Sequence, residues 1–103
     1  MGLLTDRTLP DWHPAPTALR EACRRAAEAA RARGRDIAEL ALQFSLAEER
    51  IASTFVGMAT AEDVRRNVAW SVEPPDADAL AAIQPELESV RGMTWPSGRP
   101  ENQ

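Results

Sequence analysis

Several residue types are absent or scarce in this sequence of 103 residues. It contains no tyrosine and no lysine, all twelve basic residues are arginine, and aromatic residues make up only 5% of it. The single cysteine, Cys23, excludes an internal disulfide and is typical of a protein from the reducing cytoplasm. No apolar run approaches the ~20 residues of a membrane-spanning helix, and the N-terminus lacks the basic start and apolar core of a signal peptide. These absences predict a cytoplasmic protein that does not span a membrane.

Charge and hydrophobic content set further limits. The formal net charge of −4 gives no electrostatic reason to expect binding to nucleic acid or to an anionic membrane surface. His13 has no second histidine or cysteine at the spacing of metal ligands, so no metal site is expected. Hydrophobic residues make up 44% of the chain, but many are alanines that bury little area each. The length allows one domain at most.

The most informative stretch runs from Ile51 to Asn67. Its first seven residues are rich in β-formers such as Phe55 and predict a buried strand, which Gly57 ends. Thr60 and Asp63 then have the spacing of a helix capping box. A strand, a glycine turn and a helix N-terminus together offer backbone N–H groups to an anion. The pattern therefore predicts a phosphate-bearing ligand, with a purely structural turn as the alternative.

The rest of the chain is predicted to form helices and loops. Two helices are expected on either side of Gly34, the second one capped reciprocally by Asp36 and Glu39. Pro85 is expected to kink or break the last helix. The single strand has no second strand to pair with, and an unpaired buried backbone group costs roughly 1–3 kcal/mol. We therefore expect the strand to pair with another chain or a copy of itself, or to remain unformed or helical.

Four segments resemble the aldo-keto reductase family. Met1–Thr5 resembles the end of the family's seventh strand and its glycine loop, and Asp36–Leu46 resembles the helix that leads to the eighth strand. Val56–Asn67 resembles the eighth strand and the helix after it. The tail Thr94–Asn102 is similar to that of the bacterial L-fucose or aldose dehydrogenases. Family members of this kind are (β/α)8 TIM barrels of about 250 residues or more, and this chain resembles their final third.

The resemblance implies an α/β fold: the C-terminal portion of a TIM barrel, mostly helical with about one strand and incomplete on its own. The implied parts are the loop after strand seven, helices, strand eight, helix eight, a C-terminal helix and a tail, at 1–16, 17–48, 51–57, 60–72, 76–91 and 92–103. A fragment, an alternative reading frame or a degraded gene would each give such a chain.

The resemblance also implies that the chain carries the adenosine half of a nicotinamide-cofactor site. The implied cofactor-binding residues are Gly57, Met58, Ala59, Thr60, Asp63, Arg66 and Asn67. Members that prefer the 2′-phosphorylated cofactor tend to carry arginine at the position of Asp63. A carboxylate there would repel a phosphate and accept a bond from a hydroxyl, so NAD is expected rather than NADP. In the alternative interpretation Gly57 is a simple strand exit, Thr60 only a helix cap and Arg66 a solvated residue.

The resemblance further implies a function for the complete enzyme, which is hydride transfer between a nicotinamide cofactor and a sugar or aldehyde carbonyl. Trp12 and Trp95 match loops that border the substrate, although both could be packing residues. The family's catalytic Asp, Tyr, Lys and His lie on the first half of the barrel. With no tyrosine or lysine, this chain is assigned no catalytic residue and is expected not to reduce a carbonyl alone. The alternatives are a small helical interaction module and a split-barrel subunit that pairs with an N-terminal half-barrel.

Overall fold

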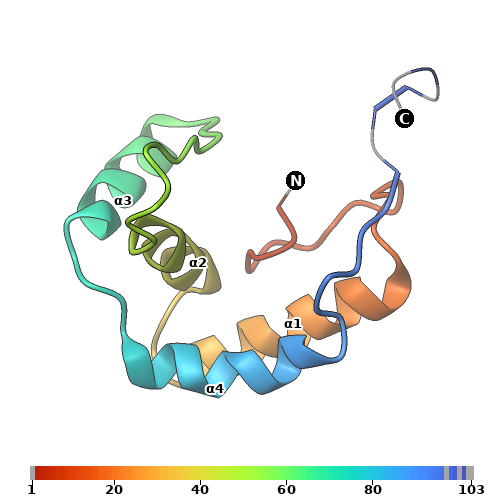
Figure 1. Cartoon of the computed structure of the whole chain (residues 1–103), viewed down its shortest axis with the longest axis horizontal. Helices are drawn as coiled ribbons and strands as arrows, with labels where there is room; N and C mark the ends of the chain where they lie inside the picture. Colours follow the sequence, from red (N-terminus) through yellow and green to blue (C-terminus); the bar gives the residue numbers. More distant parts are fainter. Residues whose placement is uncertain (1, 97, 100, 102–103) are drawn as a thin grey trace.

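The computed structural model describes residues 2–96, 98, 99 and 101, and these residues form four α-helices packed as two pairs (Figure 1). The helices are α1 (Thr17–Arg31), α2 (Ile37–Leu46), α3 (Ala61–Ser71) and α4 (Ala77–Glu88). α1 packs along α4, and α2 packs against α3. The N-terminal loop lies between the two pairs, where Leu4 packs against both groups of buried residues. Met1 and Asn102, the ends of two segments that resemble the family, lie outside the described residues.

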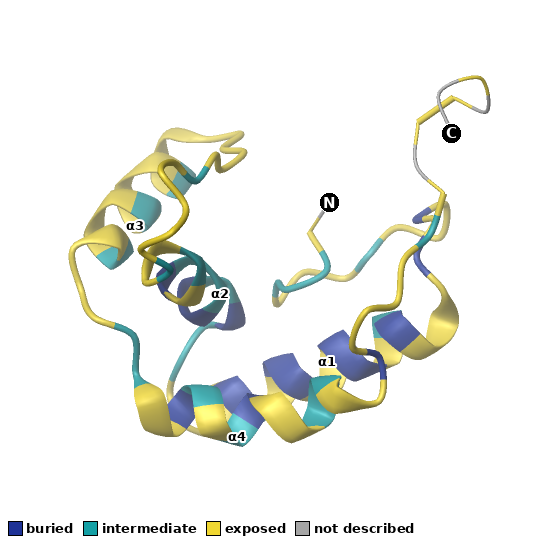
Figure 2. Cartoon of the chain, in the orientation of Figure 1, coloured by how far each residue is buried: buried dark blue, intermediate teal, exposed yellow. Residues whose placement is uncertain are grey.

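Small residues line the buried side of α1. Its buried residues are Leu19, Ala22, Cys23, Ala26, Ala27 and Ala30, which follow the helical spacing of an apolar stripe. Ala79 and Ile83 of α4 pack in one cluster with the alanines of this stripe. Figure 2 shows buried positions along both α1 and α4. Because alanine side chains add little volume, the largest fully buried side chains are Ile37 and Leu40 of α2. The two pairs of helices therefore share a core made of small residues and a few branched ones.

The strand predicted over 51–57 is not formed. The segment is irregular and the described residues contain no strand, so the expected strand is not seen, whereas the expectation of a mostly helical chain and the alternative that this segment remains unformed are confirmed. The physical reason is the missing partner, because an extended segment becomes a strand only when a neighbour takes up its backbone hydrogen bonds. Its apolar side chains remain in solvent, with Phe55 97% exposed and Ile51 56% exposed. A barrel is therefore not seen in the described residues.

The helix after this segment begins as the sequence predicts. α3 covers Ala61–Ser71, inside the predicted range 60–72, and its N-cap is Thr60. The Thr60 hydroxyl accepts from the backbone N–H of Asp63 at 3.1 Å, and the Asp63 carboxylate accepts from the backbone N–H of Thr60 at 3.1 Å. These reciprocal bonds are the capping box that the spacing of the two residues predicts.

Of two finer predictions about the helices, the reciprocal cap of α2 is wrong, and the break at Pro85, one of the two outcomes predicted there, is not seen. Asp36 caps α2 by accepting from the backbone N–H of Ala38 at 2.8 Å, but Glu39 does not return the bond. The Glu39 carboxylate instead accepts from Gln43 at 3.4 Å and pairs with Arg35 at 3.5 Å. Pro85 does not break the last helix, because α4 continues through it to Glu88. The spacing of two residues indicates which side chains can cap a helix, but whether the capping bond forms also depends on the other partners of those side chains.

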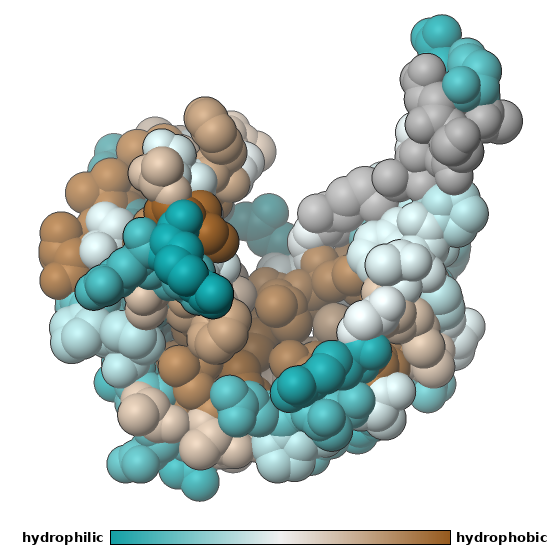
Figure 3. All heavy atoms as spheres, viewed as in Figure 1, coloured by the Kyte–Doolittle hydropathy of each residue, from teal (hydrophilic) through white to brown (hydrophobic). Residues whose placement is uncertain are grey.

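Apolar side chains remain exposed on the pair formed by α2 and α3. The large exposed hydrophobic residues of this pair and of the segment between them are Phe44, Leu46, Ile51, Phe55, Val56, Met58, Val64 and Val68. Figure 3 shows hydrophobic residues gathered in the hollow between the two arms of the molecule. Among the described residues, no helix is long and apolar enough to cross a membrane. The chain thus exposes an apolar surface that its own residues do not cover.

Candidate functional site

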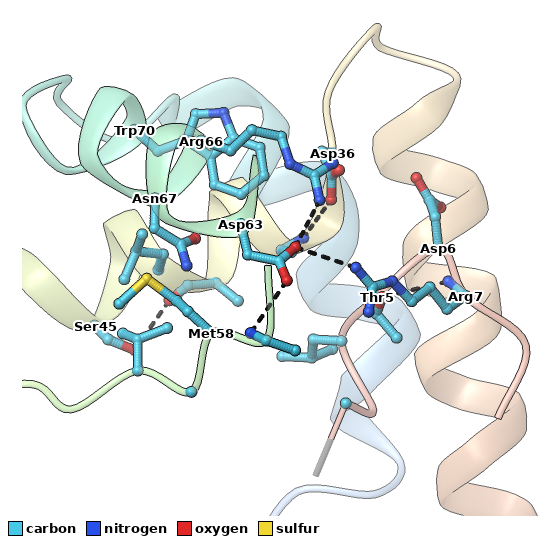
Figure 4. Close-up of a pocket in the computed structure, with 18 of the residues that line it drawn as sticks. Thr5, Asp6, Arg7, Asp36, Ser45, Met58, Asp63, Arg66, Asn67 and Trp70 are labelled. Atoms are coloured by element: carbon cyan, nitrogen blue, oxygen red, sulfur yellow. Dashed lines mark hydrogen bonds and ion pairs between the residues drawn. The ribbon is translucent and has the colours of Figure 1, made fainter. Parts of the chain in front are cut away.

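A cavity of about 700 Å³ lies where the N-terminal loop, α2 and α3 meet (Figure 4). Its wall combines the loop at Gly2 and 4–7, one side of α2, the segment 54–59 and one face of α3. The residues from α3 are Asp63, Arg66, Asn67 and Trp70, which recur at the spacing of a single helix face. The volume lies within the range of roughly 300–1,000 Å³ that small-molecule sites occupy.

The cavity brings together most of the residues that the sequence predicts for a cofactor. Six of the seven line it, namely Gly57, Met58, Ala59, Asp63, Arg66 and Asn67. The seventh, Thr60, does not line the wall but holds the first turn of α3 in place through the capping box. The irregular segment 54–59 still lines the cavity. The capped start of α3 fixes the C-terminal end of this segment.

The carboxylate of Asp63 is fully bonded. One oxygen, Oδ2, accepts from the backbone N–H groups of Thr60 at 3.1 Å and Ala59 at 3.3 Å. The other, Oδ1, accepts from the guanidinium groups of Arg66 at 3.1 Å and Arg7 at 3.2 Å (Figure 4). A carboxylate can accept about four hydrogen bonds, and these four contacts occupy all of those positions. The expectation that this carboxylate accepts from a ribose hydroxyl therefore has no support in this arrangement.

The contacts of its carboxylate also set the protonation state of Asp63. Its pKa falls from 3.8 to about 2; the contact with the Thr60 side chain contributes most, followed by the hydrogen bonds from Arg66 and from the backbone N–H groups of Ala59 and Thr60. Partial burial acts in the opposite direction, since the side chain is only 14% exposed. At neutral pH the carboxylate is ionised, and two guanidinium groups lie against its single negative charge. The cluster of Asp63, Arg7 and Arg66 thus carries a net charge of one positive unit.

Arg66 is more than a solvated surface residue. Its guanidinium lies over the ring of Trp70, with the central carbon 5.6 Å from the ring centroid, and pairs with Asp63 at the same time. This is the geometry of a cation–π contact. Trp70 is tied to α2, because the Gln43 amide donates to the Trp70 carbonyl at 3.4 Å. The face of α3 that lines the cavity is therefore held by contacts at both ends.

Arg7 is the site residue that sequence reasoning missed. It lies 56 residues before its partner Asp63, in a proline-rich loop without periodicity, so no local pattern indicates the pairing. The neighbouring Asp6 pairs in the opposite direction, with Arg31 at the end of α1, at 2.6 Å. Two consecutive residues thus fasten the loop to different helices. The loop lines the cavity because of these contacts.

The two tryptophans assigned to the substrate loops lie away from this cavity. Trp12 is 77% exposed and stacks on His13, with ring centroids 6.2 Å apart. The ring of Trp95 is tilted by 54° relative to the same histidine ring, and their centroids are also 6.2 Å apart. His13 is buried, and its Nδ1 accepts from the backbone N–H of Ala15 at 3.2 Å. The indole N–H of Trp95 is buried and has no hydrogen-bond partner among the described residues. The structure joins the N-terminal loop and the tail through this aromatic group.

The side chains that could hold a metal do not cluster. Among the described residues, no group of three or more histidine, cysteine, aspartate or glutamate side chains could bind a metal ion. Cys23 is buried, and burial raises the pKa of its thiol. The chemistry of the candidate site therefore rests on arginine, asparagine, backbone and aromatic groups.

Comparison with a curated relative confirms the predicted resemblance of this chain to the aldo-keto reductase family. The evidence is its similarity to L-galactose dehydrogenase from Arabidopsis thaliana, an aldo-keto reductase. The two sequences are 41% identical over 106 residues, which cover 99% of this chain and 33% of the relative. The chain thus spans about a third of the length of the curated relative that it matches. It matches no protein-family model.

The relative comes from a plant, whereas the tail of the chain predicts a bacterial sugar dehydrogenase. The bacterial branch remains a prediction. The relative's own name is that of a dehydrogenase acting on L-galactose, a sugar.

Proposed function

We propose that this chain carries the adenosine-binding part of the nicotinamide-cofactor site of an aldo-keto reductase that acts on a sugar. The observation that supports this most strongly is the cavity of about 700 Å³ that gathers six of the seven predicted cofactor residues. The relative, a dehydrogenase, supports the nicotinamide cofactor and the sugar substrate. The compartment that fits a chain with one buried thiol is the reducing cytoplasm.

The donor set at the cavity fits an adenine nucleotide. The amide of Asn67 can donate to a ring nitrogen and accept from the exocyclic amine of adenine. Arg66 and Trp70 present flat groups against which a base can stack, and Gly57 leaves room for the backbone to approach the ligand. When bound in the complete enzyme, the cofactor supplies or accepts the hydride, and these residues bind and orient its adenosine end.

We propose NAD as the preferred form. Gly57 offers no side chain at the turn, and Asp63 keeps Arg66 engaged instead of leaving it for a 2′-phosphate. The net positive charge of the cluster opposes this preference, so the comparison of NAD with NADP is a direct test. A ratio of dissociation constants in favour of NADP would contradict the proposal.

The catalytic groups have to come from outside these 103 residues, because the sequence contains neither tyrosine nor lysine. A second candidate function follows from the exposed apolar side chains of α2, α3 and the segment between them. In this alternative the chain is a split-barrel subunit, or a helical interaction module, that covers this surface with another polypeptide or a second copy.

The proposed function is tested by titrating the chain with NAD and following binding by calorimetry and by amide chemical shifts. We expect Asn67→Ala to weaken binding, because the adenine loses both hydrogen bonds. The matched control is Arg65→Gln on the same helix, since Arg65 is 73% exposed, pairs with Glu62 and does not line the cavity. Equal affinity for Asn67→Ala and the unchanged chain would contradict the assignment of the adenine contact.

A further inference from the structure

Segment 51–57, which joins α2 to α3, leaves its backbone hydrogen-bonding groups unpaired (Figure 1). The N–H of Ile51 donates to the carbonyl of Glu48 at 3.1 Å, and the next backbone donor along the chain is the N–H of Ala59, which bonds to Asp63. Among the described residues, no backbone group of residues 52–58 makes a hydrogen bond. Because these residues are largely exposed, their donors and acceptors are open to a strand from another chain.

The composition of the segment favours such pairing. It contains β-branched and aromatic residues but no charged residue and no proline, which are the residues that protect natural edge strands from pairing. Short uncharged segments of high β-propensity are those that pair between chains. Phe55 is 97% exposed and Ile51 is 56% exposed, so the apolar side chains also lack cover. The segment therefore lacks only a neighbouring strand.

Charge at the two ends of the segment favours an antiparallel pair of copies. Before the segment, Glu48, Glu49 and Arg50 carry a net charge of one negative unit, and Arg50 pairs with Glu48 at 2.8 and 2.6 Å. After it lies the cluster of Asp63 and its two arginines, with a net charge of one positive unit. An antiparallel pair places the negative end of each copy beside the positive end of the other, whereas a parallel pair places like charges together.

Side-chain pairing selects the register. With Ser53 opposite Ser53 of a second copy, Ile51 and Phe55 lie opposite each other twice, and an aromatic residue paired with a β-branched one is favourable. Side chains are closest at non-hydrogen-bonded pairs, with Cα atoms about 4.5 Å apart, which suits these two contacts. In that arrangement the N–H of Thr54 donates to the second copy and the N–H of Ser53 faces solvent. Centring the pair on Thr54 instead would place Ile51 opposite Gly57 and lose both contacts.

We propose that segment 51–57 is a self-association site, which forms an antiparallel two-stranded sheet with the same segment of a second copy, centred on Ser53. A two-stranded sheet needs an apolar layer to be stable in water. The helices on both sides of the segment offer one, with the exposed side chains of Phe44, Val64 and Val68. The inference names the partner in the second candidate function and does not rest on the cofactor site.

The test compares the unchanged chain with Thr54→Pro and the matched control Ser53→Pro, without cofactor. Sedimentation over a range of concentrations measures dimer formation, and the infrared amide I band measures antiparallel strand. We expect the unchanged chain to dimerise with a strand signal that rises with concentration. Thr54→Pro removes an N–H that bonds to the second copy, twice by symmetry, so the dissociation constant of the dimer should rise roughly tenfold or more. Ser53→Pro removes an N–H that faces solvent, and its dissociation constant should stay within about twofold of the unchanged value.

A second measurement tests the register through a disulfide. Ser53→Cys combined with Cys23→Ala should form a disulfide between two copies on mild oxidation, because the two Cα atoms lie opposite each other. Val72→Cys, at an 82% exposed position outside the segment, is the control and should remain reduced. A chain that stays monomeric, association without a strand signal, or equal losses in both proline variants would overturn the inference. Binding of NAD, which tests the proposed function, is a separate readout.

Discussion

Arg7 and Asp63 lie 56 residues apart in the sequence, yet the guanidinium Nη2 of one is 3.2 Å from the carboxylate Oδ1 of the other. The contact joins the N-terminal loop to the start of α3 across the candidate cofactor cavity. The same carboxylate closes the capping box of α3, so one side chain fixes a helix end and holds a basic residue at the cavity. Helix formation and site assembly therefore depend on the same group.

Loss of the N-cap should destabilise α3. Thr60→Ala removes the hydroxyl that accepts from the backbone N–H of Asp63, and removal of such a cap costs about 1 kcal/mol. We expect a lower midpoint in urea denaturation followed by circular dichroism. Ser53→Ala, in the exposed segment before the helix, is the control and should leave the midpoint unchanged. If both substitutions have the same effect, the capping box does not stabilise the helix.

Acid should weaken the start of α3 in a defined range of pH. The folded-state pKa of Asp63, about 2, is lower than its ordinary value of 3.8, so its bonds stabilise the fold fully above pH ~4. This contribution is lost as the pH falls from about 4 to about 2, because the carboxylate is then protonated in the folded chain. The carboxyl carbon shift of Asp63, followed by NMR, should titrate near 2. In Asp63→Asn the corresponding loss of stability should be absent; a midpoint near 4 would show that the contacts do not form.

The isolated chain should not turn over a sugar or an aldehyde. It has no tyrosine that could protonate a carbonyl oxygen and no lysine that could adjust the pKa of such a tyrosine. We expect the absorbance of reduced nicotinamide to change no faster than with a control protein when NAD or NADP is mixed with aldose substrates. Turnover that copurifies with the chain through two different purification tags would contradict this expectation.

The exposed apolar surface should cause self-association. Phe55, in the segment between α2 and α3, is 97% exposed, and Val68 of α3 is 60% exposed. We expect light scattering to give a mass that rises with concentration, and Phe55→Asp with Val68→Asp to reduce it, because apolar contact is replaced by charge repulsion. Trp12→Asp, at an exposed aromatic residue away from this surface, is the control. A monomer at all concentrations, with a sharp cooperative melt, would rule out association through this surface.

The parts of the fold that depend on local sequence were predictable, and the parts that depend on distant partners were not. The capping box follows from two side chains three residues apart, and the stripe of α1 follows from the spacing of Leu19 and its alanines. Segment 51–57 has the composition of a strand, but composition does not supply a neighbour. The α3 residues proposed to bind the cofactor were predicted from the resemblance to the family, and the structure places Asp63, Arg66 and Asn67 on one face of that helix. The pairing of Arg7 was not, because it depends on where the chain places a loop.

We expect the two ion pairs of the N-terminal loop to weaken as the salt concentration rises. Asp6 and Arg7 are consecutive, and they connect the loop to α1 and α3, which belong to different helix pairs. Both arginine partners are largely in solvent, so dissolved ions screen these contacts, over a Debye length of about 10 Å at 0.1 M. Raising the ionic strength would therefore loosen the loop from α1 and α3, while the apolar core that the two helix pairs share would remain. The loop is thus attached by charge, whereas the two helix pairs are attached to each other by apolar packing.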